Sequence, residues 1–214
     1  MAAYSDTVLY LIGGPNGSGK TTIAQSIMNQ YQDIKFLNED EIARENVFIS
    51  NASAGRILLE KMEEVFSTHD SFIFETTLSG RFHNELIQRA HAAGYKIEFL
   101  YVVLSSVEQN LARVKKRVAR VGHDVPENVV RRRHDKSLFN FDSVYKLVDS
   151  WKLYDNAGPE YKLIASGTGA DINIVQPDIY SSFMEHKADV VSKYRAEIMA
   201  RRASRIAKSN NLQK

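Results

Sequence analysis

A glycine-rich segment near the start of the chain constrains its fold more than any other feature. Residues 14–22 read GPNGSGKTT and directly follow the apolar run Val8–Ile12. The segment matches the pattern G-x-x-x-x-G-K-[ST], in which a strand leads into a phosphate-binding loop (P-loop) and a helix begins near the lysine. The positive end of that helix and the backbone N–H groups of the loop converge on one anionic site. The match therefore predicts an α/β protein that binds a nucleotide.

The same pattern assigns an expected role to each residue of the loop. Backbone N–H groups would contact the phosphates, the Lys20 ammonium group would reach the β and γ phosphates, and the Thr21 hydroxyl group would bind Mg²⁺. The predicted nucleotide-binding residues of the loop are Gly14, Pro15, Asn16, Gly17, Ser18, Gly19, Lys20, Thr21 and Thr22.

The bulk composition limits the remaining classes of protein. The 28 Lys and Arg residues are nearly balanced by 26 Asp and Glu, so a net charge of +2 gives no global argument for nucleic-acid binding. The chain has no cysteine, which excludes disulfides and thiolate metal sites. No apolar stretch approaches the roughly 20 residues that span a bilayer, and the first residues do not read as a secretion signal. We expect a cytoplasmic protein with neither a membrane nor a nucleic acid as its partner.

Strand and helix signals alternate along the chain. After the loop helix, which we expect to end near residue 31, apolar runs predict strands over 35–37, 71–74, 96–104, 151–156 and 161–166. Helical patterns fall at 54–68, 81–93, 106–120, 126–138 and 177–208. This order predicts a P-loop NTPase fold, which is a three-layer α/β/α sandwich with a mainly parallel sheet, a helical lid and a C-terminal helical extension. The expected boundaries are 1–176 for the P-loop domain, about 113–136 for its lid and 177–214 for the extension.

Polar residues follow the second predicted strand at the edge of the sheet where such proteins bind ligands. Asp40 is the candidate general base for an acceptor hydroxyl group. Glu39 and Glu41 compete with Asp40 for that role, and any of the three can instead be a favourable charge at a helix N-terminus. Asn38 either binds the acceptor or caps the helix.

Glu75, Thr76 and Thr77 follow the buried strand at 71–74. Their carboxylate and two hydroxyl groups suit recognition of a substrate hydroxyl group or a water-mediated contact to Mg²⁺. The alternative is a capped turn between a strand and a helix.

A basic segment spans residues 113–136, where nine basic residues stand against three acidic ones. Arg113, Arg117 and Arg120 are spaced by four and three, so one helical face presents all three. A lid that closes over phosphates would use such a face to stabilise charge in the transition state. The alternative is a solvated basic surface.

Five segments, taken in order, resemble the zeta-toxin-like P-loop kinases. They are LIGGPNGSGKTT, FLNEDEIA, FETTLSG, RVKKRVARVGHDVPENVVRRR and WKLYDNAG, and they span approximately residues 8–166. The resemblance implies a kinase that uses ATP or GTP with Mg²⁺. Characterised zeta toxins phosphorylate the 3′-hydroxyl group of UDP-N-acetylglucosamine and are held inactive by an antitoxin. A small-molecule acceptor such as a UDP-sugar and an antitoxin protein are therefore the implied partners.

The resemblance also implies roles for individual residues. It makes Asp40 the base and matches Glu75 and Thr77 to a Glu-x-Thr substrate motif, with Arg81 close to a family arginine. Asn156 falls in a late segment that lies near the nucleotide base in the family. Family members use two separated lid arginines, for which the candidates here are Arg113 or Arg117 and then Arg120 or Arg133, with His123 at one aligned position.

The last part of the chain is basic, with eight basic residues against two acidic ones over residues 187–214. A solvated helix, an RNA-binding tail and a membrane-surface tail remain open for it. For the whole chain the leading hypothesis is a kinase that transfers the γ-phosphoryl group of ATP or GTP to a hydroxyl group of a nucleotide sugar, as the toxin of a toxin–antitoxin pair. The alternatives are a polynucleotide 5′-hydroxyl kinase and a nucleotide-gated binding module without transferase activity.

Overall fold

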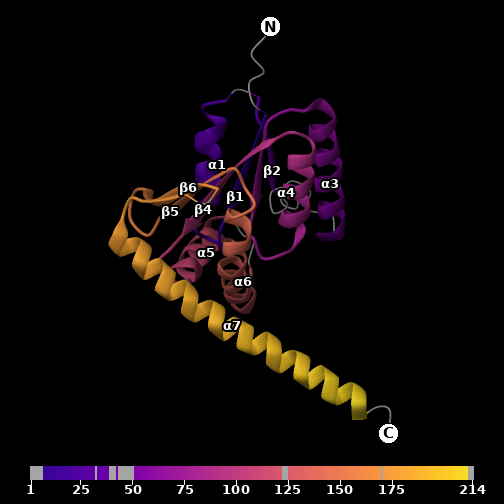
Figure 1. The fold of residues 1–214 in the computed structure, drawn as a ribbon, viewed down its shortest axis with the longest axis vertical. Coiled ribbons are helices and arrows are strands. Elements are labelled where there is room, and N and C mark those ends of the chain that lie inside the picture. The colour runs from indigo at the N-terminus through magenta and orange to yellow at the C-terminus, as the bar shows by residue number, and fades with distance from the viewer. Residues whose placement is uncertain are drawn as a thin grey trace.

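A twisted sheet flanked by helices on both faces organises the protein (Figure 1). The computed structural model describes residues 7–31, 33–38, 42, 51–121, 125–169 and 171–211. Within them the sheet has seven strands in the order β2-β3-β1-β4-β5-β6-β7. The strands are β1 (Val8–Gly13), β2 (Lys35–Asn38), β3 (Phe72–Thr76), β4 (Lys96–Val103), β5 (Ser150–Asp155), β6 (Lys162–Thr168) and β7 (Asp171–Ile174). The helices are α1 (Lys20–Met28), α3 (Asn51–Thr68), α4 (Phe82–Ala92), α5 (Val107–Val121), α6 (Glu127–Tyr145) and α7 (Pro177–Asn211).

The first five strands of the sheet order, β2 to β5, pair in parallel, whereas β6 and β7 are antiparallel to their neighbours. Parallel pairing requires crossover connections, and the helices that alternate with these strands supply them. The predicted fold class, a mainly parallel sheet between helical layers, is therefore confirmed.

Alternation along the central strand β1 decides which helices cover which face. Leu9 and Leu11 point into a core built with side chains of α3, α4, α6 and α7, and both are fully buried. Ile12 lies in the smaller core on the opposite face, where it packs against Ala24 and Ile27 of α1. Burial of each such side chain stabilises the fold by roughly 1.5–3 kcal/mol. The P-loop thus leaves a strand that is anchored on both faces.

The structure extends the sequence prediction furthest at α6 and β7. Helix α6 continues to Tyr145 rather than 138, because Phe141 and Val144 carry its buried face onward. Strand β7 was not expected. Its four residues are all exposed, so it has no run of buried apolar side chains from which a strand is predicted.

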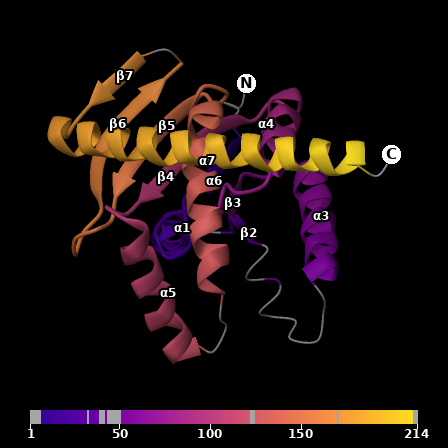
Figure 2. The same ribbon diagram turned by 90° about the horizontal axis from the view of Figure 1, so that it is seen from below.

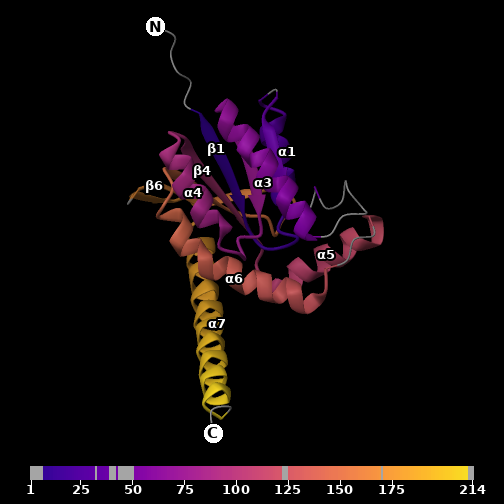
Figure 3. The same cartoon turned by 90° about the vertical axis from the view of Figure 1, so that its right-hand side faces the viewer.

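Helix α7 is 35 residues long, and its C-terminal part projects away from the rest of the molecule (Figures 1 and 3). Its first turns pack on α6, where Phe183 enters the core and the Lys187 ammonium group donates to the Asp142 carboxylate. Seen from below, the helix runs across α6 (Figure 2). None of the described helices is long and apolar enough to cross a membrane.

We predict that His83 makes folding sensitive to mild acid. Its side chain is 3% exposed, and burial lowers its pKa to about 4 from 6.5. Between these two pH values the unfolded chain binds a proton that the folded chain does not, so the free energy of unfolding falls as the pH falls, by up to about 1.4 kcal/mol per unit.

Urea unfolding at pH 7.0 and pH 5.0 measures this effect. His83→Gln should lose less stability than the wild type over that interval, because glutamine does not titrate. Equal losses in the two proteins would show that His83 is not the source of the acid sensitivity.

Candidate functional site

The P-loop lies between the end of β1 and the start of α1, and its glycines are required by its geometry. Gly14 and Gly19 have φ angles of 145° and 104°, which side chains rarely permit. A Cβ atom on Gly14 would lie 2.3 Å from the Val102 carbonyl oxygen, and one on Gly19 would lie 2.3 Å from Asn156 Nδ2. The loop is therefore packed tightly against β4 and the end of β5.

The N-terminus of α1 is open to an anion. Its N-cap position is Gly19, no side chain caps the helix, and its first turn contains no acidic residue. The first N–H groups of a helix have no partner within it and carry partial positive charge. A phosphate group supplies the missing acceptors, so this described end of α1 fits the nucleotide that the sequence pattern predicts.

Lys20, Thr21 and Glu75 meet at this helix end. The Lys20 side chain is 6% exposed, and its ammonium group donates to the Pro15 carbonyl oxygen at 3.0 Å and lies 3.9 Å from Glu75 Oε1. The Thr21 hydroxyl group donates to Glu75 Oε2 at 2.9 Å. Strand register explains the meeting, because Glu75 pairs with Ile12, two residues before the loop.

The hydroxyl and carboxylate oxygens of Thr21 and Glu75 are of the kind that Mg²⁺ prefers. The described residues contain no group of three or more His, Cys, Asp or Glu side chains that would form a metal site by themselves. Ligands for Mg²⁺ at this helix end would therefore come from Thr21, from Glu75 directly or through water, and from the phosphates.

A small cavity of about 70 Å³ brings the predicted acceptor residues together with Lys20. Strand β2 contributes Asn38, which is opposite Glu75 in the sheet, and α6 contributes Arg133. The cavity is lined by Lys20, Asn38, Phe74, Glu75, Thr76, Thr77 and Arg133. We call Glu75, Thr76 and Thr77, the polar residues at the end of β3, the polar wall. The structure thus brings this wall together with Arg133 of the basic segment, although the two are distant in sequence.

Two hydroxyl groups of that wall already take part in local hydrogen bonds. Thr76 Oγ1 accepts from the Leu78 N–H at 3.1 Å, and Thr77 Oγ1 is 2.8 Å from Ser79 Oγ. Thr76 therefore orders the turn after β3, whereas Thr77 and Ser79 form a hydroxyl pair beside the cavity.

The remaining arginine candidates are dispersed. Arg113 lies beside the loop, where it donates to the Asn156 carbonyl oxygen at 2.6 Å. Arg117 is exposed on α5, and Arg81 is exposed just before α4. The side chain of Arg120 lies outside the described part of the structure.

Several acidic candidates and one histidine candidate also fall outside the described residues. They are Glu39, Asp40, Glu41 and His123. Their predicted roles therefore stay predictions.

Three polar side chains hold the P-loop on the side facing the protein. Asn110 Nδ2 donates to the Asn16 carbonyl oxygen at 2.8 Å, Asn156 Nδ2 donates to the Ser18 carbonyl oxygen at 2.7 Å, and the Tyr161 hydroxyl group donates to the Gly19 carbonyl oxygen at 2.7 Å. The sequence indicates only Asn156 among them, through the family resemblance.

Nothing in the sequence singles out Tyr161, because 142 positions separate it from Gly19. A local signal exists for Asn110, since it is a polar residue one helical turn before Val114 on the buried face of α5.

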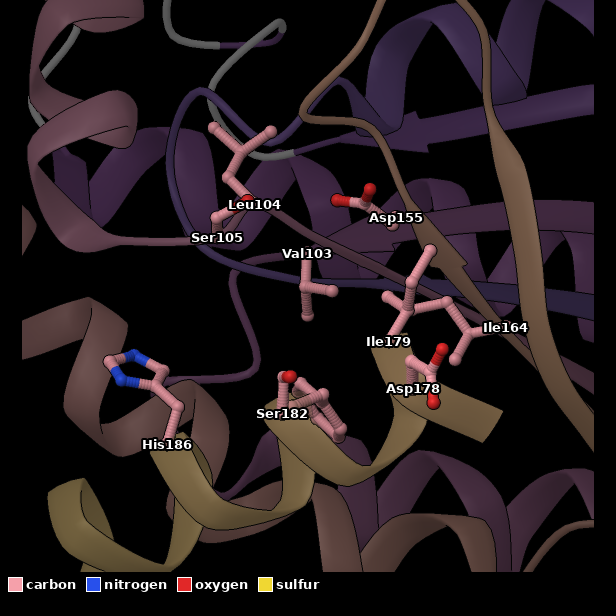
Figure 4. A pocket seen from close by; sticks show the side chains of 10 residues that line it. Val103, Leu104, Ser105, Asp155, Ile164, Asp178, Ile179, Ser182 and His186 are labelled. Carbon is pink, nitrogen blue, oxygen red and sulfur yellow. The ribbon is translucent and has the colours of Figure 1, made fainter. Parts of the chain in front are cut away.

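The described residues also form two larger hollows. One of about 520 Å³ runs along α1 and reaches Thr22 and Tyr161. The other, of about 310 Å³, lies between the first turns of α7 and the ends of β4 and β5, with Asp155 and Asp178 from different elements on its wall (Figure 4). No P-loop residue lines this second hollow, so it is separate from the phosphate site.

Comparison with proteins of solved structure supports the fold. The crystal structure of the AvrRxo1-ORF1:-ORF2 complex with ATP superposes with a TM-score of 0.65 at 19% identity, covering 83% of this chain and 63% of that one. This chain therefore spans less than two thirds of that solved chain. The PezAT toxin–antitoxin system of Streptococcus pneumoniae gives a TM-score of 0.56 at 14% identity, over 87% of this chain and 88% of that one.

Sequence comparison supports a family. An uncharacterised protein of Haemophilus influenzae is 34% identical over 128 residues, which are 56% of this chain and 88% of that protein. Residues 9–143 match the model of AAA_33, described as an AAA domain. This match includes the P-loop, the polar wall after β3 and most of α6, and it spans more than half of the chain. The protein therefore belongs to this AAA domain family.

Proposed function

We propose that this protein is a kinase that transfers the γ-phosphoryl group of ATP or GTP to a hydroxyl group of a nucleotide sugar resembling UDP-N-acetylglucosamine. The observation that carries the proposal is the cavity where Lys20, Glu75 and Arg133 meet Asn38 and Thr77. A protein that only binds a nucleotide needs the P-loop lysine but has no need of a polar wall and an arginine opposite it.

The chemistry follows from the charges in the site. Lys20 and the loop N–H groups bind the β and γ phosphates, and Arg133 approaches the γ-phosphoryl group from α6. Thr21 and Glu75 would hold Mg²⁺, which neutralises charge on the phosphate oxygens when bound. Asn38 and Thr77 would orient the acceptor. The acceptor oxygen forms a bond to the γ phosphorus, the bond from that phosphorus to the β–γ bridging oxygen breaks, and the hydroxyl proton passes to Asp40.

Similarity to other proteins supports the finer parts of the proposal. The complex with ATP supports ATP as the donor. The likeness to the PezAT system, together with the motifs that resemble zeta toxins, supports a cytoplasmic toxin that an antitoxin protein holds inactive. Both likenesses are below 20% identity and show the fold alone, so the acceptor and the cellular role are part of the proposal.

Lys20→Ala should abolish phosphorylation. The change removes the ammonium group that contacts the phosphates while leaving the strand and helix that carry it. The measurement is incubation with γ-labelled ATP, Mg²⁺ and either UDP-N-acetylglucosamine or a metabolite extract, followed by mass identification of labelled products.

Lys61→Ala, an exposed change on α3, is the control and should keep wild-type activity. A 5′-hydroxyl oligonucleotide is offered as a further acceptor. If only the oligonucleotide became labelled, the acceptor would be a polynucleotide and not a nucleotide sugar. Retained ATP binding with no labelled product from any acceptor would contradict the kinase proposal.

Asp40→Asn should separate binding from transfer. Asparagine keeps the size of the side chain but takes no proton, so we expect the rate of transfer to fall at least a hundredfold with unchanged affinity for ATP. Single-turnover kinetics and calorimetric titration with ATP measure the two quantities. Asp171→Asn, at the far edge of the sheet, is the matched control. Equal transfer rates in Asp40→Asn and the wild type would remove Asp40 as the base.

A further inference from the structure

The connection between β5 and β6 reaches back to the P-loop at two consecutive peptide groups. Asn156 is 7% exposed, its own N–H donates to the Val103 carbonyl oxygen at 3.0 Å, and its side chain donates to the Ser18 carbonyl oxygen at 2.7 Å. Tyr161 donates to the next carbonyl oxygen of the loop, that of Gly19, at 2.7 Å. Both donors lie in a part of the chain that follows the parallel strands of the sheet.

These two bonds help to fix where two of the loop N–H groups point, together with the first backbone hydrogen bonds of α1. In a trans peptide group the C=O and N–H bonds point in opposite directions. A donor on the Ser18 carbonyl oxygen therefore aims the Gly19 N–H away from Asn156. The Gly19 carbonyl oxygen already accepts from the Thr22 N–H at 3.0 Å. Tyr161 adds a second donor to this oxygen, which stabilises the orientation in which the Lys20 N–H points away from Tyr161. Both N–H groups belong to the open end of α1, where the phosphate is expected.

The surroundings of each donor favour a fixed position. The ring of Tyr161 lies in the wall of the hollow along α1, and burial raises the pKa of its hydroxyl group, which stays protonated and able to donate. Asn156 is held in turn by Arg113, whose guanidinium group donates to the main-chain carbonyl oxygen of Asn156 at 2.6 Å. A charged donor makes a stronger hydrogen bond than a neutral one. Helix α5 is thereby connected to Asn156.

We propose that Asn156 and Tyr161 are positioning residues that orient the Gly19 and Lys20 N–H groups toward the phosphates of the nucleotide. We call these two residues the clamp. The inference rests on the nucleotide binding in the proposed function but not on phosphoryl transfer. Neither side chain contacts the reacting atoms, and each acts through a loop carbonyl group.

Tyr161→Phe tests the clamp with the smallest change, because it removes one hydroxyl group and keeps the ring. The expected result is about a tenfold loss of affinity for Mg²⁺–ATP, of the size that one hydrogen bond contributes. Affinity for inorganic tripolyphosphate should fall by the same factor, because the effect lies at the phosphates and not at the base. Isothermal titration gives the first affinity, and displacement of a fluorescent ATP analogue gives the second.

Tyr154→Phe is the matched control. Its ring lines the same hollow, and the change leaves both donors to the Ser18 and Gly19 carbonyl groups in place. It should bind both ligands as the wild type does. Asn156→Ala should also lower the affinity for both ligands about tenfold. The thermal unfolding midpoint of Tyr161→Phe should stay close to that of the wild type, which separates positioning from general destabilisation.

The possible failures are distinguishable. Wild-type affinity in Tyr161→Phe, or a loss for ATP without a loss for tripolyphosphate, would overturn the clamp and leave the kinase proposal standing. A wild-type protein that binds ATP but forms no product would overturn the kinase proposal and leave the clamp standing. A wild-type protein that does not bind ATP would overturn both.

Discussion

The open N-terminus of α1 is the constraint on which the rest of the site depends. Its first N–H groups have no side-chain cap, its first turn contains no acidic residue, and a glycine in a left-handed conformation occupies the N-cap position. Such an end is costly to leave without acceptors and attracts an anion. The surrounding structure fixes the loop from the protein side, through hydrogen bonds from Asn110, Asn156 and Tyr161 to three loop carbonyl groups.

Local sequence predicts the parts of the site that local structure builds. The P-loop was predicted because its glycines, lysine and threonine are contiguous and their spacing is dictated by one strand, one turn and one helix. Glu75 was predicted because a carboxylate directly after a buried strand must lie at the ligand-binding edge of a parallel sheet. The structure brings both features within hydrogen-bonding distance of each other, as the bond from Thr21 to Glu75 shows.

Charge density in the basic segment was less informative. The spacing predicts Arg113, Arg117 and Arg120 on one face of a helix. In the structure Arg113 lies against the P-loop, and Arg117 is exposed. Arg133 reaches the cavity from a different helix, and Arg131, two residues away, pairs at the surface with Glu108 and Glu127. Sequence gives the number of charges on a segment, whereas the packing of α5 against α6 decides which of them faces the phosphate site.

The antiparallel end of the sheet illustrates the same limit at longer range. Strand β6 adds Ile164 and Ala165 to the core, whereas β7 adds nothing to it and is exposed along its whole length. Yet the turn that leads into β6 carries both residues that bind the Ser18 and Gly19 carbonyl groups. If the only role of this hairpin were to cover apolar surface, an apolar side chain at position 161 would serve as well as tyrosine. The hydroxyl group against a P-loop carbonyl instead connects the hairpin to phosphate binding, and this connection is set by tertiary pairing that no local sequence pattern encodes.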